Sequence, residues 1–137
     1  MSKIPHWSHA LSVRNAQLDE QHIILTELSK ELISLARDES LTDTRILEVL
    51  QEFAGYAKRH YELEEGVLAA NQCPTLDEHT KTHRTAEEEL KRWIDAAKSC
   101  RLDRPAIAAY FEDWMQHHLA ETDMPAKEYL SHTVRRA

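Results

Sequence analysis

Apolar residues recur at three- and four-residue steps along four stretches of the chain, which is the spacing of one face of an α-helix. The first stretch runs from about Leu18 to Arg37 and the second from about Thr44 to Ala69. A capping box of Thr75 and Glu78 begins the third stretch, and Asp103 precedes the fourth. The pattern therefore predicts an all-α protein built from four helices.

Only two glycines and four prolines interrupt the chain, so the connections between these helices are short. Short connections favour an antiparallel up-down-up-down four-helix bundle. At 137 residues the chain has the length of a single domain. We expect an N-terminal arm over 1–17 anchored by Trp7, the bundle over 18–123, and a tail over 124–137 with a short final helix or turn.

Each apolar stripe contains polar side chains near one end. These are His22 in the first helix, His60 and Glu64 in the second, His79 and His83 in the third, and His118 followed by Asp123 in the fourth. In an up-down-up-down bundle the start of the first and third helices meets the end of the second and fourth. All of these side chains are therefore expected at one level of the bundle.

This convergence indicates metal binding, because imidazole and carboxylate groups together can hold a pair of iron ions. Residues four apart lie on one helix face, so His79 and His83 can bind the same ion. Glu64 and Asp123 each carry two oxygens and are the natural bridges between two ions. Zinc or manganese could bind to the same groups.

Any one of these residues, taken alone, also fits a purely structural role, since a single buried histidine is usually a hydrogen-bonded core residue. Burying all of them without a metal would leave many polar groups unsatisfied, at about 1–3 kcal/mol each. The fourth helix leaves one choice open: His117 and His118 both lie on acceptable helical stripes. Trp93 and Phe53 are expected in the plain core, and His6, His9 and His132 at the surface.

The formal charge of −7, with no Lys/Arg cluster before Arg135 and Arg136, argues against nucleic acid or an anionic membrane as the main partner. No apolar run approaches the roughly 20 residues that cross a bilayer, and the first residues lack the apolar segment of a signal peptide. We therefore expect a cytoplasmic protein. Cys73 and Cys100 form no C-x-x-C pair and are expected to be buried or half-buried thiols.

Four motifs, in this order and spacing, resemble the hemerythrin family in its single-domain bacterial form. They are Leu18-Asp19-Glu20-Gln21-His22, then His60-Tyr61-Glu62-Leu63-Glu64-Glu65, then His79-x-x-x-His83, and then Trp114-Met115-x-x-His118-Leu119-x-x-x-Asp123. The resemblance covers nearly the whole chain, and its last motif selects His118 over His117. It implies a four-helix bundle that binds dioxygen at a non-heme di-iron centre.

Carried over by position, the resemblance implies that His79, His83 and His118 bind one iron and that His22 and His60 bind the other. Glu64 and Asp123 would bridge the two ions together with an oxo or hydroxo group, and the iron with fewer ligands would keep a position for dioxygen. The wall of the dioxygen pocket is expected to comprise Leu25, Tyr61, Ala86, Trp114, Met115 and Leu119.

Three positions of this wall depart from the family pattern. Ala86 replaces a bulky aromatic that is common one turn after the second histidine of the third motif. Tyr61 stands where phenylalanine is common, and Met115 where leucine is. A roomier or wetter pocket would follow, with consequences for oxygen affinity and autoxidation.

Reversible dioxygen binding for storage, transport or delivery is thus the expected function, and not an enzymatic one. One alternative is a peroxidase-like or nitric oxide-handling enzyme on the same centre. Oxygen-activating di-iron enzymes, however, use paired Glu-x-x-His motifs that are not seen at these places. Another alternative is an oxygen or redox sensor acting through a separate signalling or oxygen-consuming partner. A monomer is the default expectation.

Overall fold

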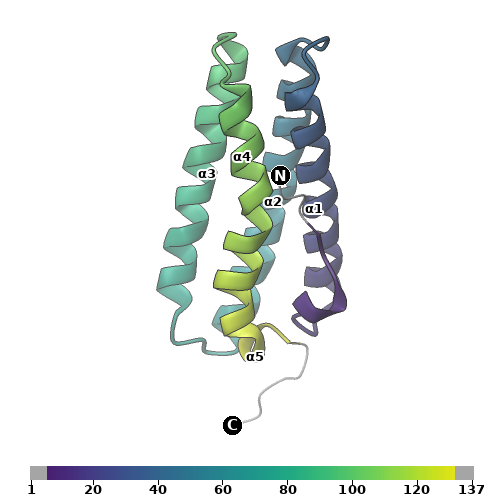
Figure 1. The fold of residues 1–137 in the computed structure, drawn as a ribbon. Coiled ribbons are helices and arrows are strands. Elements are labelled where there is room, and N and C mark those ends of the chain that lie inside the picture. The colour runs from purple at the N-terminus through teal and green to yellow at the C-terminus, as the bar shows by residue number, and fades with distance from the viewer. Residues whose placement is uncertain (1–5, 132–137) are drawn as a thin grey trace.

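The computed structural model describes residues 6–131 and is built from helices joined by short turns (Figure 1). No strand occurs in this range. The body of the protein consists of α1 (Ala16–Arg37), α2 (Asp43–Ala70), α3 (Leu76–Lys98) and α4 (Arg104–Met115). The predicted all-α four-helix fold is confirmed.

Successive helices run in opposite directions, as the short turns require (Figure 1). Helices α1 and α4 pack closely, as do α2 with α3 and α1 with α2. The pair α3 and α4 does not belong to these closely packed pairs. One long face of the bundle, between α3 and α4, is therefore more open than the others.

The starts of α3 and α4 test the two predicted caps. Asp103 begins α4 as predicted, because its carboxylate accepts a hydrogen bond of 3.0 Å from the N–H of Ala106. The predicted capping box at Thr75 and Glu78 is wrong, since the Thr75 side chain accepts no hydrogen bond from a backbone N–H of α3. Its backbone, with φ −105° and ψ 20°, lacks the extended conformation in which a side chain usually caps.

The fourth helix does not stop at Met115 but changes its winding. A π-helical segment, η2 (Gln116–Asp123), follows α4 directly. It leads into a single 3-10 turn, η3 (Met124–Ala126), and then into the short helix α5 (Lys127–Leu130). The predicted short C-terminal helix is therefore present.

Two asparagine side chains fasten α5 across the end of the bundle. Asn15, which caps α1, donates from Nδ2 to the carbonyl of Leu130 at 3.0 Å. Asn71, at the end of α2, donates to the carbonyl of Tyr129 at 2.7 Å. The start of α1 and the end of α2 are thus held at the same end of the bundle.

Aromatic rings fill the core, and two predictions about exposure need correction. The rings of Phe53 and Phe111 meet edge to face with centroids 5.0 Å apart, and Phe53 is fully buried as predicted. Trp93 is only half-buried, because it lies beside the open face between α3 and α4. Cys73 is buried, but Cys100 is exposed in the turn after α3, where its φ is 55°.

The described part of the N-terminal arm lies against the bundle. It contains one 3-10 turn, η1 (His9–Leu11), and Trp7 packs partly buried against the core as predicted. His6 and His9 are exposed, whereas His132 lies outside the described residues. Within residues 6–131, no helix combines the length and apolar character that a bilayer span requires.

Candidate metal centre

The polar side chains of the four stripes meet at the end of the bundle where α1 begins. Helix α1 contributes His22, α2 contributes His60 and Glu64, α3 contributes His79 and His83, and η2 contributes His118 and Asp123. All are buried, and His22, His60, His83, Glu64 and Asp123 are fully so. The structure confirms that these side chains lie at one level of the bundle.

His60 lies at the centre of the cluster. Its Nε2 atom is 3.0 Å from Nε2 of His22 and 3.0 Å from Nε2 of His118. Three imidazole nitrogens from three different elements therefore face one another. No stripe of apolar side chains separates them.

The two carboxylates each contact histidines from different helices. Oδ2 of Asp123 is 3.0 Å from Nε2 of His22 and 3.1 Å from Nε2 of His118. Oε1 of Glu64 is 3.0 Å from Nε2 of His83, and its Oε2 is 3.1 Å from Nε2 of His60. Each carboxylate thus connects separate histidines of the cluster.

The π-helical winding of η2 explains how His118 and Asp123 share one side. In an α-helix, residues five apart are turned about 140° from one another around the axis. A π-helix forms i to i+5 hydrogen bonds, and such segments are frequent at functional sites. Thr122 follows the same five-residue step, because its hydroxyl donates to the carbonyl of His117 at 3.0 Å. The wider turn brings the Asp123 carboxylate beside the His118 ring.

The structure distinguishes His118 from His117 as a member of the cluster, a choice that helical periodicity alone could not make. The His117 side chain is 83% exposed and pairs with Glu121, at 2.8 Å between Nδ1 and Oε2. His118 is 6% exposed, and its ring stacks on Trp114 with centroids 4.8 Å apart. His118 therefore belongs to the cluster, and His117 belongs to the surface.

Outer hydrogen bonds fix the ring orientation of two histidines. Nδ1 of His60 donates to Oε1 of Gln21 at 2.9 Å, and Nδ1 of His83 donates to Oε2 of Glu65 at 2.8 Å. Arg84 in turn pairs with Glu65. A proton held on Nδ1 leaves the lone pair of Nε2 directed into the cluster, which is the tautomer that binds metals.

His79 is the most peripheral of the histidines. Its Nδ1 atom is 3.2 Å from the carbonyl oxygen of Thr75, and its Nε2 is 3.2 Å from that of Thr122. The centroid of its ring is 6.3 Å from that of His83. His79 is buried next to the cluster without joining its network of imidazoles and carboxylates.

Burial and neighbouring charges shift the pKa values of the cluster residues in opposite directions. Burial disfavours the charged form of His22, but hydrogen bonds to Asp123 and Glu64 outweigh it and raise its pKa to about 9. Burial dominates at His60 and lowers its pKa to about 4. Burial would raise the pKa of Glu64, but the histidines around it, His60 first, lower it well below its usual range.

The chemistry of this set of atoms fits a bound metal. Ligand atoms of five residues lie within 4.8 Å of one another, namely His22, His60, Glu64, His118 and Asp123. A proton can join two of these atoms, whereas a cation can be bound by several at once. Among the described residues, Nδ1 of His22 and Oδ1 of Asp123 have no hydrogen-bond partner. Such unsatisfied groups are costly when buried, unless an ion is bound.

A groove of about 710 Å³ leads to the cluster between α3 and α4. Its floor includes Tyr61, His83 and His118, and its aromatic walls include Trp93 and Trp114. The Tyr61 ring stacks on the His83 imidazole with centroids 4.2 Å apart and planes 12° apart. The groove therefore reaches the edge of the cluster at His118, which is 6% exposed, whereas His83 beneath the Tyr61 ring is 0% exposed.

The expected wall of the dioxygen pocket divides into two parts. Tyr61, Ala86 and Trp114 line the groove. Leu25 and Leu119 are fully buried and Met115 nearly so, and none of the three lines it. Half of the expected wall is thus closed core, and the other half faces a groove that the sequence did not predict.

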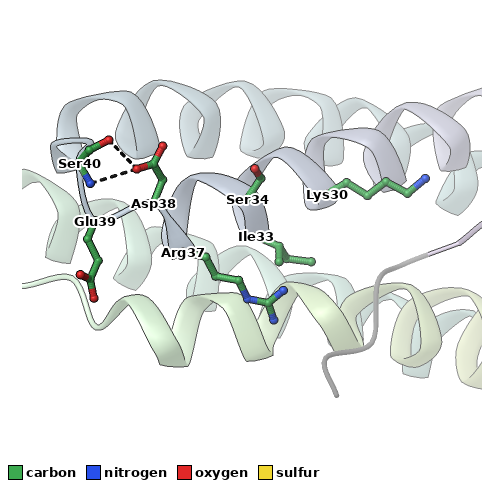
Figure 2. Close-up of a pocket in the computed structure, with 7 residues that line it drawn as sticks. All are labelled: Lys30, Ile33, Ser34, Arg37, Asp38, Glu39 and Ser40. Carbon is green, nitrogen blue, oxygen red and sulfur yellow. Dashed lines mark hydrogen bonds between the residues drawn. The ribbon is translucent and has the colours of Figure 1, made fainter.

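A second hollow lies far from the cluster, around the C-terminal end of α1. Figure 2 shows the residues that line it, with Asp38 accepting hydrogen bonds from the backbone and the hydroxyl of Ser40. Its lining comprises Lys30, Ile33, Ser34, Arg37, Asp38, Glu39 and Ser40. These side chains form ordinary surface contacts, such as the ion pair of Arg37 with Glu112, and contain no group of metal ligands.

Comparison with known proteins agrees with the site. The family model described as the hemerythrin HHE cation binding domain matches residues 14–130. Two curated proteins named bacteriohemerythrin come from Campylobacter jejuni subsp. jejuni, one from serotype O:6 (strain 81116 / NCTC 11828) and one from serotype O:2 (strain ATCC 700819 / NCTC 11168). Each is 28% identical over 120 residues, which cover 87% of this chain and 90% of the relative.

Proposed function

The chain belongs to the hemerythrin family, and from that premise we propose that it binds dioxygen reversibly at a non-heme di-iron centre. The observation that carries the proposal is the convergence of buried imidazole and carboxylate atoms within 4.8 Å of one another. Two ferrous ions would supply the electrons and the open coordination position that reversible dioxygen binding uses. The protein's own residues would bind the ions, orient the ligands and exclude water.

We propose that His79, His83 and His118 hold one iron and that His22 and His60 hold the other. The bridging role of Glu64 is supported by its two oxygens, which lie 3.0 Å from His83 and 3.1 Å from His60. These two histidines belong to different halves of the proposed centre.

The proposed bridging role of Asp123 has the same kind of support. Its Oδ2 atom contacts Nε2 of His22 and Nε2 of His118, again one histidine from each half. An oxo or hydroxo group derived from solvent would complete the bridge. The two carboxylates would offset part of the charge of two cations in a buried site.

His79 would have to change its contacts to serve as a ligand. Its Nε2 is within hydrogen-bond distance of the Thr122 carbonyl, so binding would replace that contact by a bond to the metal. Its Nδ1 would keep the contact with the Thr75 carbonyl. That contact leaves Nε2 as the metal-binding nitrogen, as at His60 and His83.

The apolar residues around His22 and His60 would keep water away from the dioxygen position. Leu25 and Leu119 are fully buried, and Met115 is 4% exposed. Dioxygen is small and apolar, so an apolar wall accommodates it beside the iron and disfavours water and ions.

The test is to load the metal-free protein anaerobically with ferrous iron, admit dioxygen, and follow the visible spectrum through repeated cycles under argon. Reversible appearance and loss of an absorption band in every cycle supports oxygen carriage. A change that argon does not reverse contradicts it. The His22→Ala variant serves as a control, because it removes a proposed ligand of the iron with the open position.

A peroxide- or nitric oxide-handling activity is the second candidate, and the groove beside Ala86 favours it. The groove reaches His118 at the edge of the cluster and would admit small substrates to the centre. Sustained consumption of hydrogen peroxide by the iron-loaded protein, lost in the His118→Ala variant, would favour this activity. A role as a sensor would require a separate partner protein, and the monomeric state and cytoplasmic location expected from the sequence remain predictions.

A further inference from the structure

The cluster is closed on the sides formed by the closely packed helix pairs. His22, His60, Glu64 and Asp123 are 0% exposed, and the neighbouring Leu25 and Leu119 are equally inaccessible. Helices α1 and α4 pack tightly on this side, as do α1 and α2. Small molecules therefore have no path to the cluster between these helices without local opening.

Two places bring the surface close to the cluster. One is a hollow beside His79, whose rim includes the carboxylates of Glu78, Glu121 and Glu128. The other is the groove between α3 and α4, whose floor contains His83 and His118. The acidic rim of the first hollow disfavours anions, and its lining mixes polar side chains with Pro74, Pro125 and Ala126, whereas the groove is lined mainly by rings and methyl groups.

The charges at the rim of the groove are mixed. Lys81 lies on one side, and Glu89 and Asp113 also line it. Such an arrangement creates no strong field of one sign, so it selects neither anions nor cations. Below the rim, Trp93, Tyr110 and Trp114 present aromatic surface. The groove therefore suits small uncharged molecules.

The floor of the groove carries one polar group whose proton has no acceptor. The hydroxyl of Tyr61 is buried beside the indole of Trp114, which can only donate, and no described residue accepts the phenol proton. Tyr61 as a whole is 1% exposed, and its ring covers the His83 imidazole. A small molecule with an acceptor atom that reaches the floor could accept a hydrogen bond from this hydroxyl before it meets the cluster.

We propose that the groove between α3 and α4 is the entrance through which small uncharged molecules, dioxygen among them, reach the histidine cluster. Ala86 keeps this entrance open, because its side chain is a single methyl group on the lining beside Tyr61 and His83. This inference rests on the proposed function, which gives the entrance its biological role. Access through the groove can nevertheless be measured without iron.

Trp114 provides the probe, because it lines the groove and stacks on His118. The chain has three tryptophans, so replacing Trp7 and Trp93 by Phe leaves Trp114 as the only one. In this metal-free background, the rate constant for quenching of Trp114 fluorescence by dissolved dioxygen reports access to the floor. The pH is held constant throughout.

The decisive variant is Ala86→Phe, compared with Ala69→Phe at an exposed position of α2 outside the groove. The proposal predicts that Ala86→Phe lowers the quenching rate constant several-fold and that Ala69→Phe leaves it unchanged. An unchanged rate constant in Ala86→Phe would overturn the proposal. Equal losses in both variants would also overturn it, because the effect would then not depend on the groove.

A second, smaller substitution covers the case in which Ala86→Phe does not fold, as judged by far-ultraviolet circular dichroism. Ala86→Leu should lower the quenching rate constant as well, by a smaller factor, and an unchanged value there overturns the proposal. The result is independent of iron. If the entrance is confirmed and the iron-loaded protein fails to release dioxygen, only the proposed function is contradicted.

Discussion

Gln21 holds the ring of His60 from the outer side of the cluster, with 2.9 Å between its Oε1 and Nδ1 of His60. The two residues come from different helices, α1 and α2. The contact fixes the proton on Nδ1 and directs Nε2 toward His22 and His118. Gln21 therefore determines the metal-binding tautomer of the histidine at the centre of the cluster.

Replacing Gln21 by Met should weaken iron binding, since Met has a similar size but no carbonyl acceptor. The loss of an outer hydrogen bond of this kind typically costs about 10–100-fold in metal affinity. Competition with a chromophoric chelator measures the change. Gln51→Met, at an exposed position of α2, is the matched control and should retain the parent affinity. Equal affinities for the two variants would contradict the role of Gln21.

The choice between two adjacent histidines gives a second prediction. His118→Ala should lower the iron content of the loaded protein, because it removes an imidazole from the buried cluster. His117→Ala should leave the iron content unchanged, because that side chain is exposed and paired with Glu121. Metal analysis after gel filtration measures the iron content of both variants. Full iron content in His118→Ala would refute the proposed ligand set.

The level of the cluster in the bundle was predictable from the sequence for a physical reason. Helical periodicity identifies the buried face of each helix, and short turns fix the direction of its neighbours. Together they predict that His22, His60, His83 and Glu64 lie at one end of the bundle. Helical periodicity leaves His117 and His118 as alternatives, and only the resemblance to the family motif selects His118.

What the sequence reasoning missed depends on winding and on distances between helices. Sequence reasoning included Asp123 in the cluster, but it did not predict the π-helical winding of η2 that brings Asp123 beside His118; the five-residue spacing of the two residues was the available signal. The groove follows from looser packing between α3 and α4, about which periodicity says nothing. Trp93 was accordingly expected in the core, although it is half-buried beside the groove.

The metal-free protein should be most stable near pH 6.5. The pKa of His60 falls from 6.5 to about 4 on folding, so its contribution to stability is lost as the pH drops from 6.5 toward 4. The pKa of His22 rises to about 9, so its contribution is complete below 6.5 and is lost as the pH rises through 9. Urea denaturation across this pH range measures the loss of stability on both sides of pH 6.5.

The decline in stability above pH 6.5 can be assigned to His22 by substitution. His22→Asn should flatten the decline between pH 6.5 and 9, whereas His9→Asn, at an exposed position of η1, should preserve it. If the parent protein shows constant stability over that interval, the raised pKa of His22 is wrong.

Tyr61→Phe should stabilise the metal-free protein. The phenol is buried, and no described residue accepts its proton. An unsatisfied buried group costs about 1–3 kcal/mol, so its removal should raise the free energy of unfolding by about 1 kcal/mol. Tyr56→Phe, at a half-buried position of the same helix, should change this free energy little. A loss of stability in Tyr61→Phe would mean that the hydroxyl has a partner after all.

The most direct test of the central claim is the amount of dioxygen that the iron-loaded protein releases under argon, measured against its iron content. The proposed centre predicts two irons per chain and the release of one dioxygen per pair of irons, repeated without loss over several cycles. Uptake of dioxygen without release, or a chain that retains fewer than two irons, would contradict it.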